Sequence, residues 1–153
     1  MIECRPIGIC SWDFDLRGEG HVARLGFGWP TEQGWMSIDG RSYRIEKQGF
    51  LSGTWELVEG GKVRMSAAKR SAFTRSFDMV TPLGAFRLEA ALFAGRTMNL
   101  VGPGTDVSIG PIHAFTKRAT ITGRLPDFEV AAFAFWLTAL TWRRAANNHV
   151  ASS

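Results

Sequence analysis

The sequence lacks the residues that disulfide-stapled and metal-stabilised domains need. Its 153 residues include two cysteines, Cys4 and Cys10, and three scattered histidines, so no metal-ligand spacing is present. Residues 1–10 contain no apolar run of the kind that forms the core of an export signal. We therefore expect a cytoplasmic protein, peripheral to the membrane if it contacts one, in which both cysteines are free thiols.

Patterns typical of catalysis are also absent. Residues 18–23 match the spacing of a dinucleotide-binding loop, but the glycines and proline that follow are incompatible with the helix that would hold a pyrophosphate. Asp13 and Asp15 share one face of an expected strand. The simplest interpretation is a solvated outer face, and the alternative is an acid–base pair or a cation site. Ser108 lacks the first glycine of a nucleophile elbow. We expect no enzyme, no cofactor and no metal site.

Glycine and aromatic residues are abundant, at 17 Gly, 11 Phe, 6 Trp and 1 Tyr. Between residues 12 and 121, apolar and polar residues alternate in short segments separated by glycine-bearing turns, a pattern typical of antiparallel sheet. Residues 18–34 are rich in glycine and predict a long irregular connection. Strands are expected in one segment carrying Trp12, Phe14 and Leu16 on one face, and then in residues 35–38, 42–47, 54–58, 62–67, 73–80, 85–93, 96–101, 107–113 and 118–122, as hairpins or single strands.

The pattern changes after residue 126, where Asp127 is a good N-cap and residues 127–146 predict a helix. Residues 130–142 are apolar on every side, so this helix must be surrounded by protein or by lipid. The run spans about 20 Å, which is short of the roughly 30 Å hydrocarbon layer and favours burial in protein over a C-terminal membrane anchor. Five large side chains are expected inside the protein: Phe133, Phe135, Trp136, Leu137 and Leu140.

A string of hairpins can surround a helix on all sides only by closing on itself. Closure also removes exposed strand edges, and a barrel of more than eight strands is wide enough to need a filling. The sequence therefore predicts one mainly β domain over residues 1–153. It is a closed antiparallel barrel of about nine to twelve strands, with the C-terminal helix threaded through its centre.

Several loosely spaced motifs point to a known architecture. They are Gly40, Tyr43 and Ile45; Trp55 and Leu57; Ala67 and Lys69; Phe73, Arg75 and Phe77; Ile109, Gly110 and Ile112; and the final apolar helix over residues 128–142. Together they resemble the tubby C-terminal-like superfamily, which includes tubby domains, phospholipid scramblases and LURP-one-related proteins. The resemblance implies a barrel of about twelve strands around a central C-terminal helix, and it implies phosphoinositide headgroups as a ligand class. The calcium-binding and regulatory segments of scramblases are not present in this sequence.

Basic residues are the candidate ligand site for an anionic headgroup. The predicted set is Lys62, Arg64, Lys69, Arg70 and Arg75. Arg75 alternates with Phe73 and Phe77, so it should point inward, where it needs a carboxylate or several carbonyls; a structural anchor is expected first and anion binding second.

The sequence predicts a non-enzymatic binding module for anionic phospholipid through a basic outer surface; the alternative is a structural or protein-interaction domain without a lipid role. No helix-turn-helix or ribonucleoprotein motif favours nucleic acid. Nothing in the sequence specifies an oligomeric state.

Overall fold

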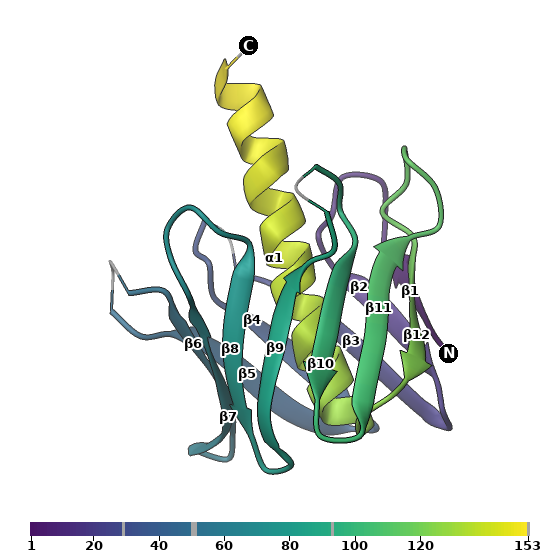
Figure 1. The fold of residues 1–153 in the computed structure, drawn as a ribbon, viewed down its shortest axis with the longest axis vertical. Helices are drawn as coiled ribbons and strands as arrows, with labels where there is room; N and C mark the ends of the chain where they lie inside the picture. Colours follow the sequence, from purple (N-terminus) through teal and green to yellow (C-terminus); the bar gives the residue numbers. More distant parts are fainter. Residues whose placement is uncertain (29, 50–51, 93, 153) are drawn as a thin grey trace.

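The computed structural model describes residues 1–28, 30–49, 52–92 and 94–152. In this part of the chain, twelve strands form a closed barrel in which every strand pairs antiparallel with its neighbours in sequence, and β1 pairs with β12 to complete the ring (Figure 1). The elements are β1 (Ile2–Pro6), β2 (Phe14–Gly18), β3 (His21–Phe27), β4 (Gly34–Ile38), β5 (Arg41–Lys47), β6 (Thr54–Glu59), β7 (Lys62–Lys69), β8 (Ser76–Thr81), β9 (Gly84–Ala90), β10 (Met98–Gly102), β11 (Thr105–Pro111), β12 (Ala119–Arg124) and α1 (Phe128–Ser152). The predicted closed barrel is confirmed.

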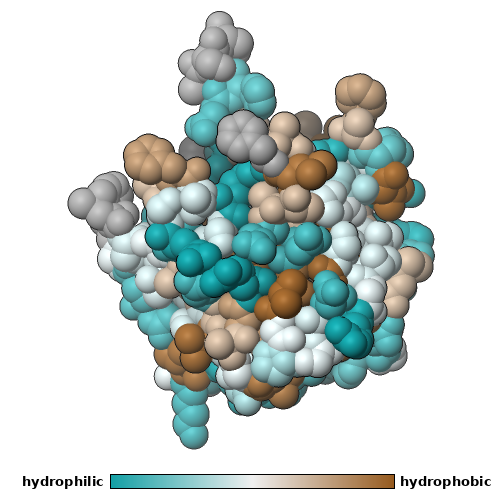
Figure 2. All heavy atoms as spheres, viewed as in Figure 1, coloured by the Kyte–Doolittle hydropathy of each residue, from teal (hydrophilic) through white to brown (hydrophobic). Residues whose placement is uncertain are grey.

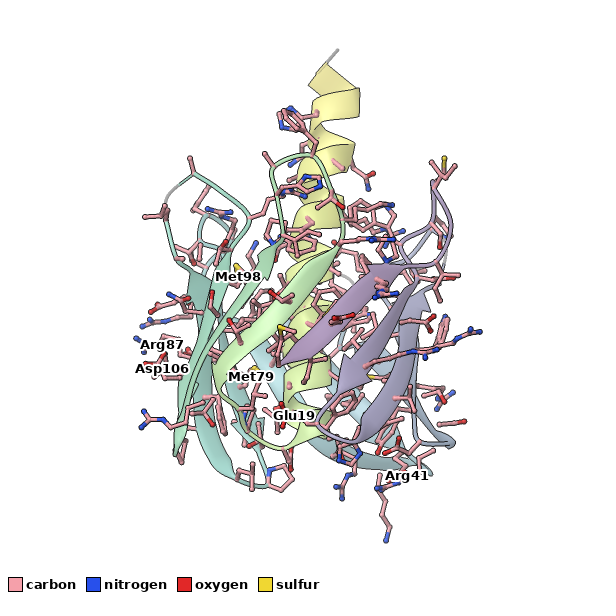
Figure 3. All side chains as sticks on the ribbon, turned by 90° about the vertical axis from the view of Figure 1, so that its right-hand side faces the viewer. Glu19, Arg41, Met79, Arg87, Met98 and Asp106 are labelled. Carbon is pink, nitrogen blue, oxygen red and sulfur yellow. The ribbon has the colours of Figure 1, made fainter. Side chains whose placement is uncertain are left out.

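Helix α1 fills the barrel. No residue between 130 and 140 is more than 1% exposed, and the alternating apolar residues of every strand pack around them. Met79 and Met98, for example, point from the wall towards the helix and are buried (Figure 3). The predicted buried helix is confirmed, although it runs on to Ser152 and passes out of one end of the barrel (Figure 1).

Local hydrogen bonds explain how the helix begins and how its polar atoms are satisfied inside an apolar barrel. The carboxylate of Asp127 accepts a hydrogen bond from the Val130 amide at 3.0 Å, which is the expected N-cap. The Thr138 hydroxyl donates to the Ala134 carbonyl one turn back at 2.9 Å, so a polar side chain is tolerated in the core. None of the helical residues that the structure describes forms an apolar stretch of membrane-spanning length.

Two expectations about the strands are wrong. The irregular connection expected over residues 18–34 contains β3, in which Ala23 and Leu25 are buried and alternate with exposed residues. A glycine at position 26 hides this strand in the sequence; a Cβ there would lie 2.1 Å from a carboxylate oxygen of Asp13 and 2.9 Å from a ring carbon of Trp35, so a larger residue would require these side chains to move. Strand β1 was not expected at all, since it offers only two inward positions; its pairing with β2 and β12 closes the barrel.

Candidate functional site

The two ends of the barrel differ in the length of their connections. At one end, which we call the turn end, five two-residue turns join the strands, at residues 19–20, 39–40, 60–61, 82–83 and 103–104. Glu19 and Arg41 mark this end in Figure 3. At the other, which we call the loop end, six connections of six or seven residues surround the emerging helix: 7–13, 28–33, 48–53, 70–75, 91–97 and 112–118. Irregular, variable-length backbone is where binding residues usually lie.

Charge separates the two ends as well. The six loops and helix residues 143–149 contain seven Lys and Arg and two Asp and Glu, a surplus of five positive charges. The five turns contain two carboxylates, from Glu19 and Asp39, and no Lys or Arg. The connections and helix residues at the loop end therefore carry the positive surplus, whereas the turns at the other end carry none.

Several of these cations connect one loop to the next. Arg75 donates to two carbonyls of loop 91–97, Arg96 donates to three carbonyls of loop 112–118, and Lys117 donates to a carbonyl of loop 7–13. The acceptors are the carbonyl oxygens of Leu92 (2.8 Å) and Gly95, of Thr116 (2.7 Å), His113 (3.1 Å) and Ala114 (2.6 Å), and of Ser11 (2.6 Å). These bonds hold the loops in place, and a carbonyl carries no net charge with which to cancel the cation.

A pocket of about 450 Å³, which we call the rim pocket, opens between loops 70–75 and 91–97. Its polar lining is Arg70, Ser71, Thr74, Arg75, Ser76 and Glu89. Ser76 is only 8% exposed, and its hydroxyl is buried without a hydrogen-bond partner in the described part of the chain. The apolar part of the lining consists of Ala90 and of two strongly exposed side chains, Phe73 and Leu92. Two cations, one carboxylate, hydroxyl groups and apolar groups thus meet in one open depression.

The structure divides the five predicted site residues between the two ends. Lys62 and Lys69 begin and end β7, so they are separated by seven residue steps, or roughly 23 Å. Lys62 and Arg64 lie at the turn end, whereas Arg70 and Arg75 line the rim pocket and Lys69 precedes it. The structure therefore brings only Arg70 and Arg75 together in one pocket, whereas Lys69 lies at the same end of the barrel but near Arg144, Glu32 and Lys47.

Arg64 is engaged at the turn end of the barrel. The pairing of β6 and β7 shifts register beside Arg64, which leaves this residue opposite no residue of β6. Its guanidinium donates to Glu129 at the start of α1 at 3.0 Å, and this bond raises the pKa of Arg64. Burial raises the pKa of the neighbouring Tyr43 to about 12, and Glu129 reinforces the shift. This cluster fixes the entry of the helix into the barrel.

The expected inward orientation of Arg75 is wrong, because β8 begins only at Ser76 and Phe73 lies in the loop, 98% exposed. The expected set of several carbonyl partners is confirmed, since Arg75 donates to Leu92 and Gly95. Arg75 is thus a half-buried anchor between two loops.

The sequence analysis did not predict a cluster of charged side chains around Glu32, which lies at the loop end beside the helix. Glu32 accepts hydrogen bonds from Arg144 on the helix and from Lys47 at 2.8 Å, and the bond from Arg144 is the main reason that its pKa falls to about 2. Arg144 and Lys47 also lie over the ring of Trp55, at 5.4 and 5.5 Å from its centroid. Burial, reinforced by Arg144, lowers the pKa of Lys69. Glu32 and Arg144 are 112 residues apart, and no sequence pattern relates them.

Comparisons with known proteins give no relative for this chain: no family model, no curated protein and no solved structure matches it. Among the residues that the structure describes, no three His, Cys, Asp or Glu side chains gather closely enough to hold a metal ion. The functional argument therefore depends on the geometry and charge of the loop end.

Proposed function

We propose that this protein is a non-enzymatic binding module that attaches to anionic phospholipid headgroups with its loop end. The observation that carries the proposal is the surplus of five positive charges over the loops and the emerging helix. Each Lys or Arg close to an anionic membrane contributes up to about 1 kcal/mol of attraction. A surplus of this size supports measurable association without a specific reaction.

Only part of the surplus is neutralised within the described part of the chain, where Arg70 lies 3.5 Å from a carboxylate oxygen of Asp78 and Arg144 is paired with Glu32. Arg96, Lys117 and Arg143 have no carboxylate within 4.0 Å there, and their described hydrogen bonds go to carbonyl oxygens. A cation held in this way is already ordered, so less conformational entropy is lost when an anion approaches. The loop end therefore presents positive charge on a preorganised frame.

The proposal retains the predicted ligand class and changes the predicted surface. The basic wall that the sequence suggested is divided between two ends, and only Lys69, Arg70 and Arg75 belong to the proposed contact region. The resemblance to the tubby C-terminal-like superfamily favours the same ligand class, but membership of that superfamily stays a prediction. Cytoplasmic location with peripheral membrane attachment likewise stays a prediction.

Matched charge variants test the proposal. Arg70→Gln/Arg118→Gln removes two exposed cations from the loop end, and Lys62→Gln/Arg124→Gln removes two exposed cations near the turn end. Both variants change the net charge equally. We expect sedimentation with vesicles containing phosphatidylserine or phosphatidylinositol bisphosphate to weaken by up to about 30-fold for the first variant and little for the second.

Salt and lipid composition provide the controls. Binding to anionic vesicles should largely vanish near 1 M salt, where the screening length is about 3 Å, and vesicles of phosphatidylcholine alone should not bind. Equal binding to neutral and anionic vesicles, or none at low salt, would refute the proposal and favour the structural or protein-interaction alternative. Stronger loss in the turn-end variant would show that the contact surface is misplaced.

A further inference from the structure

The most exposed large apolar side chains all lie at the loop end. Among the described residues, four such side chains are more than 70% exposed: Ile9 (94%), Phe73 (98%), Leu92 (74%) and Phe115 (98%). Each comes from a different loop. Figure 2 shows tan, apolar side chains standing out on either side of the helix at this end. Singly exposed apolar residues are common, but a concentration of the most exposed ones around one end marks an interaction surface.

The shape of this end selects one part of it. Helix α1 extends past the loops, so a flat surface cannot meet all six loops at once and must approach from one side (Figure 1). On the side of loops 70–75 and 91–97, two exposed apolar residues, Phe73 and Leu92, line the same pocket as Arg70 and Arg75. On this side, apolar and cationic side chains share one pocket.

Hydrogen bonds connect the described residues of the loops on this side. Arg75 connects loop 70–75 to loop 91–97 by donating to the carbonyls of Leu92 and Gly95. Within loop 70–75, the Ser71 hydroxyl lies 3.1 Å from the Thr74 hydroxyl and accepts a hydrogen bond from the Phe73 amide at 3.2 Å. Phe73 therefore projects from an internally bonded loop whose contacts do not bury its ring. The apolar groups are presented outward by a fixed frame.

The geometry points to insertion of Phe73 and Leu92 into the boundary between headgroups and acyl chains of an anionic membrane. The cations beside them would contact headgroups, while the two apolar side chains reach the layer below, which is the division that interfacial segments show. Charge complementarity favours this partner, because an apolar surface bordered by cations matches the layered chemistry of an anionic lipid surface. This inference rests on the proposed function and adds the depth and orientation of the contact.

The test compares two pairs of apolar truncations in the full chain. Phe73→Ala/Leu92→Ala removes the proposed anchors, and Val63→Ala/Leu83→Ala removes two exposed apolar side chains near the turn end. Both pairs are assayed on anionic vesicles and on phosphocellulose, an anionic surface that has no apolar layer. We expect the first pair to weaken vesicle binding by at least about tenfold with unchanged salt elution from phosphocellulose, and the second pair to behave as the parent on both.

The outcomes separate this inference from the proposed function. Unchanged vesicle binding by Phe73→Ala/Leu92→Ala overturns insertion and leaves headgroup binding intact. Equal loss on vesicles and on phosphocellulose also overturns it, because the truncation would then act on charge presentation; urea midpoints exclude an unfolded variant. A parent protein that binds no anionic vesicles overturns both statements and favours a protein partner at this surface.

Discussion

Replacing Trp136 with alanine probes the packing of the helix inside the barrel. The indole is fully buried, stacks on Phe27 with ring centroids 4.6 Å apart, and donates from Nε1 to the Gly26 carbonyl at 2.9 Å. Truncation of a buried aromatic side chain costs about 3 to 5 kcal/mol. The lost hydrogen bond contributes roughly 1 kcal/mol of this, so Trp136→Phe, which loses the bond and part of the ring but keeps an aromatic side chain, should cost about 1 to 2 kcal/mol.

Urea unfolding followed by far-ultraviolet circular dichroism measures both changes without depending on tryptophan emission. Thermal unfolding gives a second measure. For a chain of this size, 1 kcal/mol of stability corresponds to roughly 2 to 4 °C in Tm, so Trp136→Ala should melt about 6 to 20 °C below the parent. Phe115→Ala is the control, because that ring is 98% exposed and its loss should change stability by less than about 0.5 kcal/mol. If Trp136→Ala loses less than about 1 kcal/mol, or no more than Phe115→Ala, the buried-helix argument is wrong.

Two further predictions concern titratable groups. Because the folded-state pKa of Glu32 is lowered from 4.5 to about 2 by Arg144 and Lys47, its contribution to stability is present above pH 4.5 and lost as the pH falls towards 2. Glu32→Gln should therefore lower the free energy of unfolding by about 1 to 2 kcal/mol at pH 7, a figure that allows for the partial exposure of Glu32, and by much less near pH 2. An equal loss of stability at both pH values would contradict this prediction. Both cysteines are free thiols. Cys4 is buried, which raises its pKa well above the usual range, whereas Cys10 is exposed. Mass spectrometry should therefore find rapid alkylation of Cys10 and protection of Cys4 until the protein unfolds. Equal alkylation rates, or a linked Cys4–Cys10 peptide, would contradict that expectation.

Much of the architecture follows from local patterns. The alternation in segments such as 54–59 and 62–69, joined by Gly60 and Gly61, is enough to predict a hairpin, because side chains on a strand point alternately to two faces. Residues 130–142 are apolar on every side, and an apolar helix too short for a membrane must be enclosed by protein. Closure of the barrel follows from these two requirements together.

The candidate site was only partly predictable, because local patterns do not show which distant residues meet in the fold. Lys69, Arg70 and Arg75 are close in sequence and stay close in the fold, but Lys62 belongs to the far end of the same strand, and the sequence alone gave no reason to separate it from the others. Leu92 could not be assigned to the rim pocket, because its approach to Arg75 depends on how two loops fold over β8 and β9.

The sequence by itself determined the strand periodicity, the tight turns and the buried helix with its Asp127 cap, because each depends on residues within a few positions of one another. The tertiary structure alone decided which distant residues meet. Ile2 pairs with Ile121 to close the barrel, and Glu32 meets Arg144 across 112 positions. Such contacts depend on strand register and on loop conformations that are stabilised by the whole assembled barrel, so no local pattern of residues specifies them.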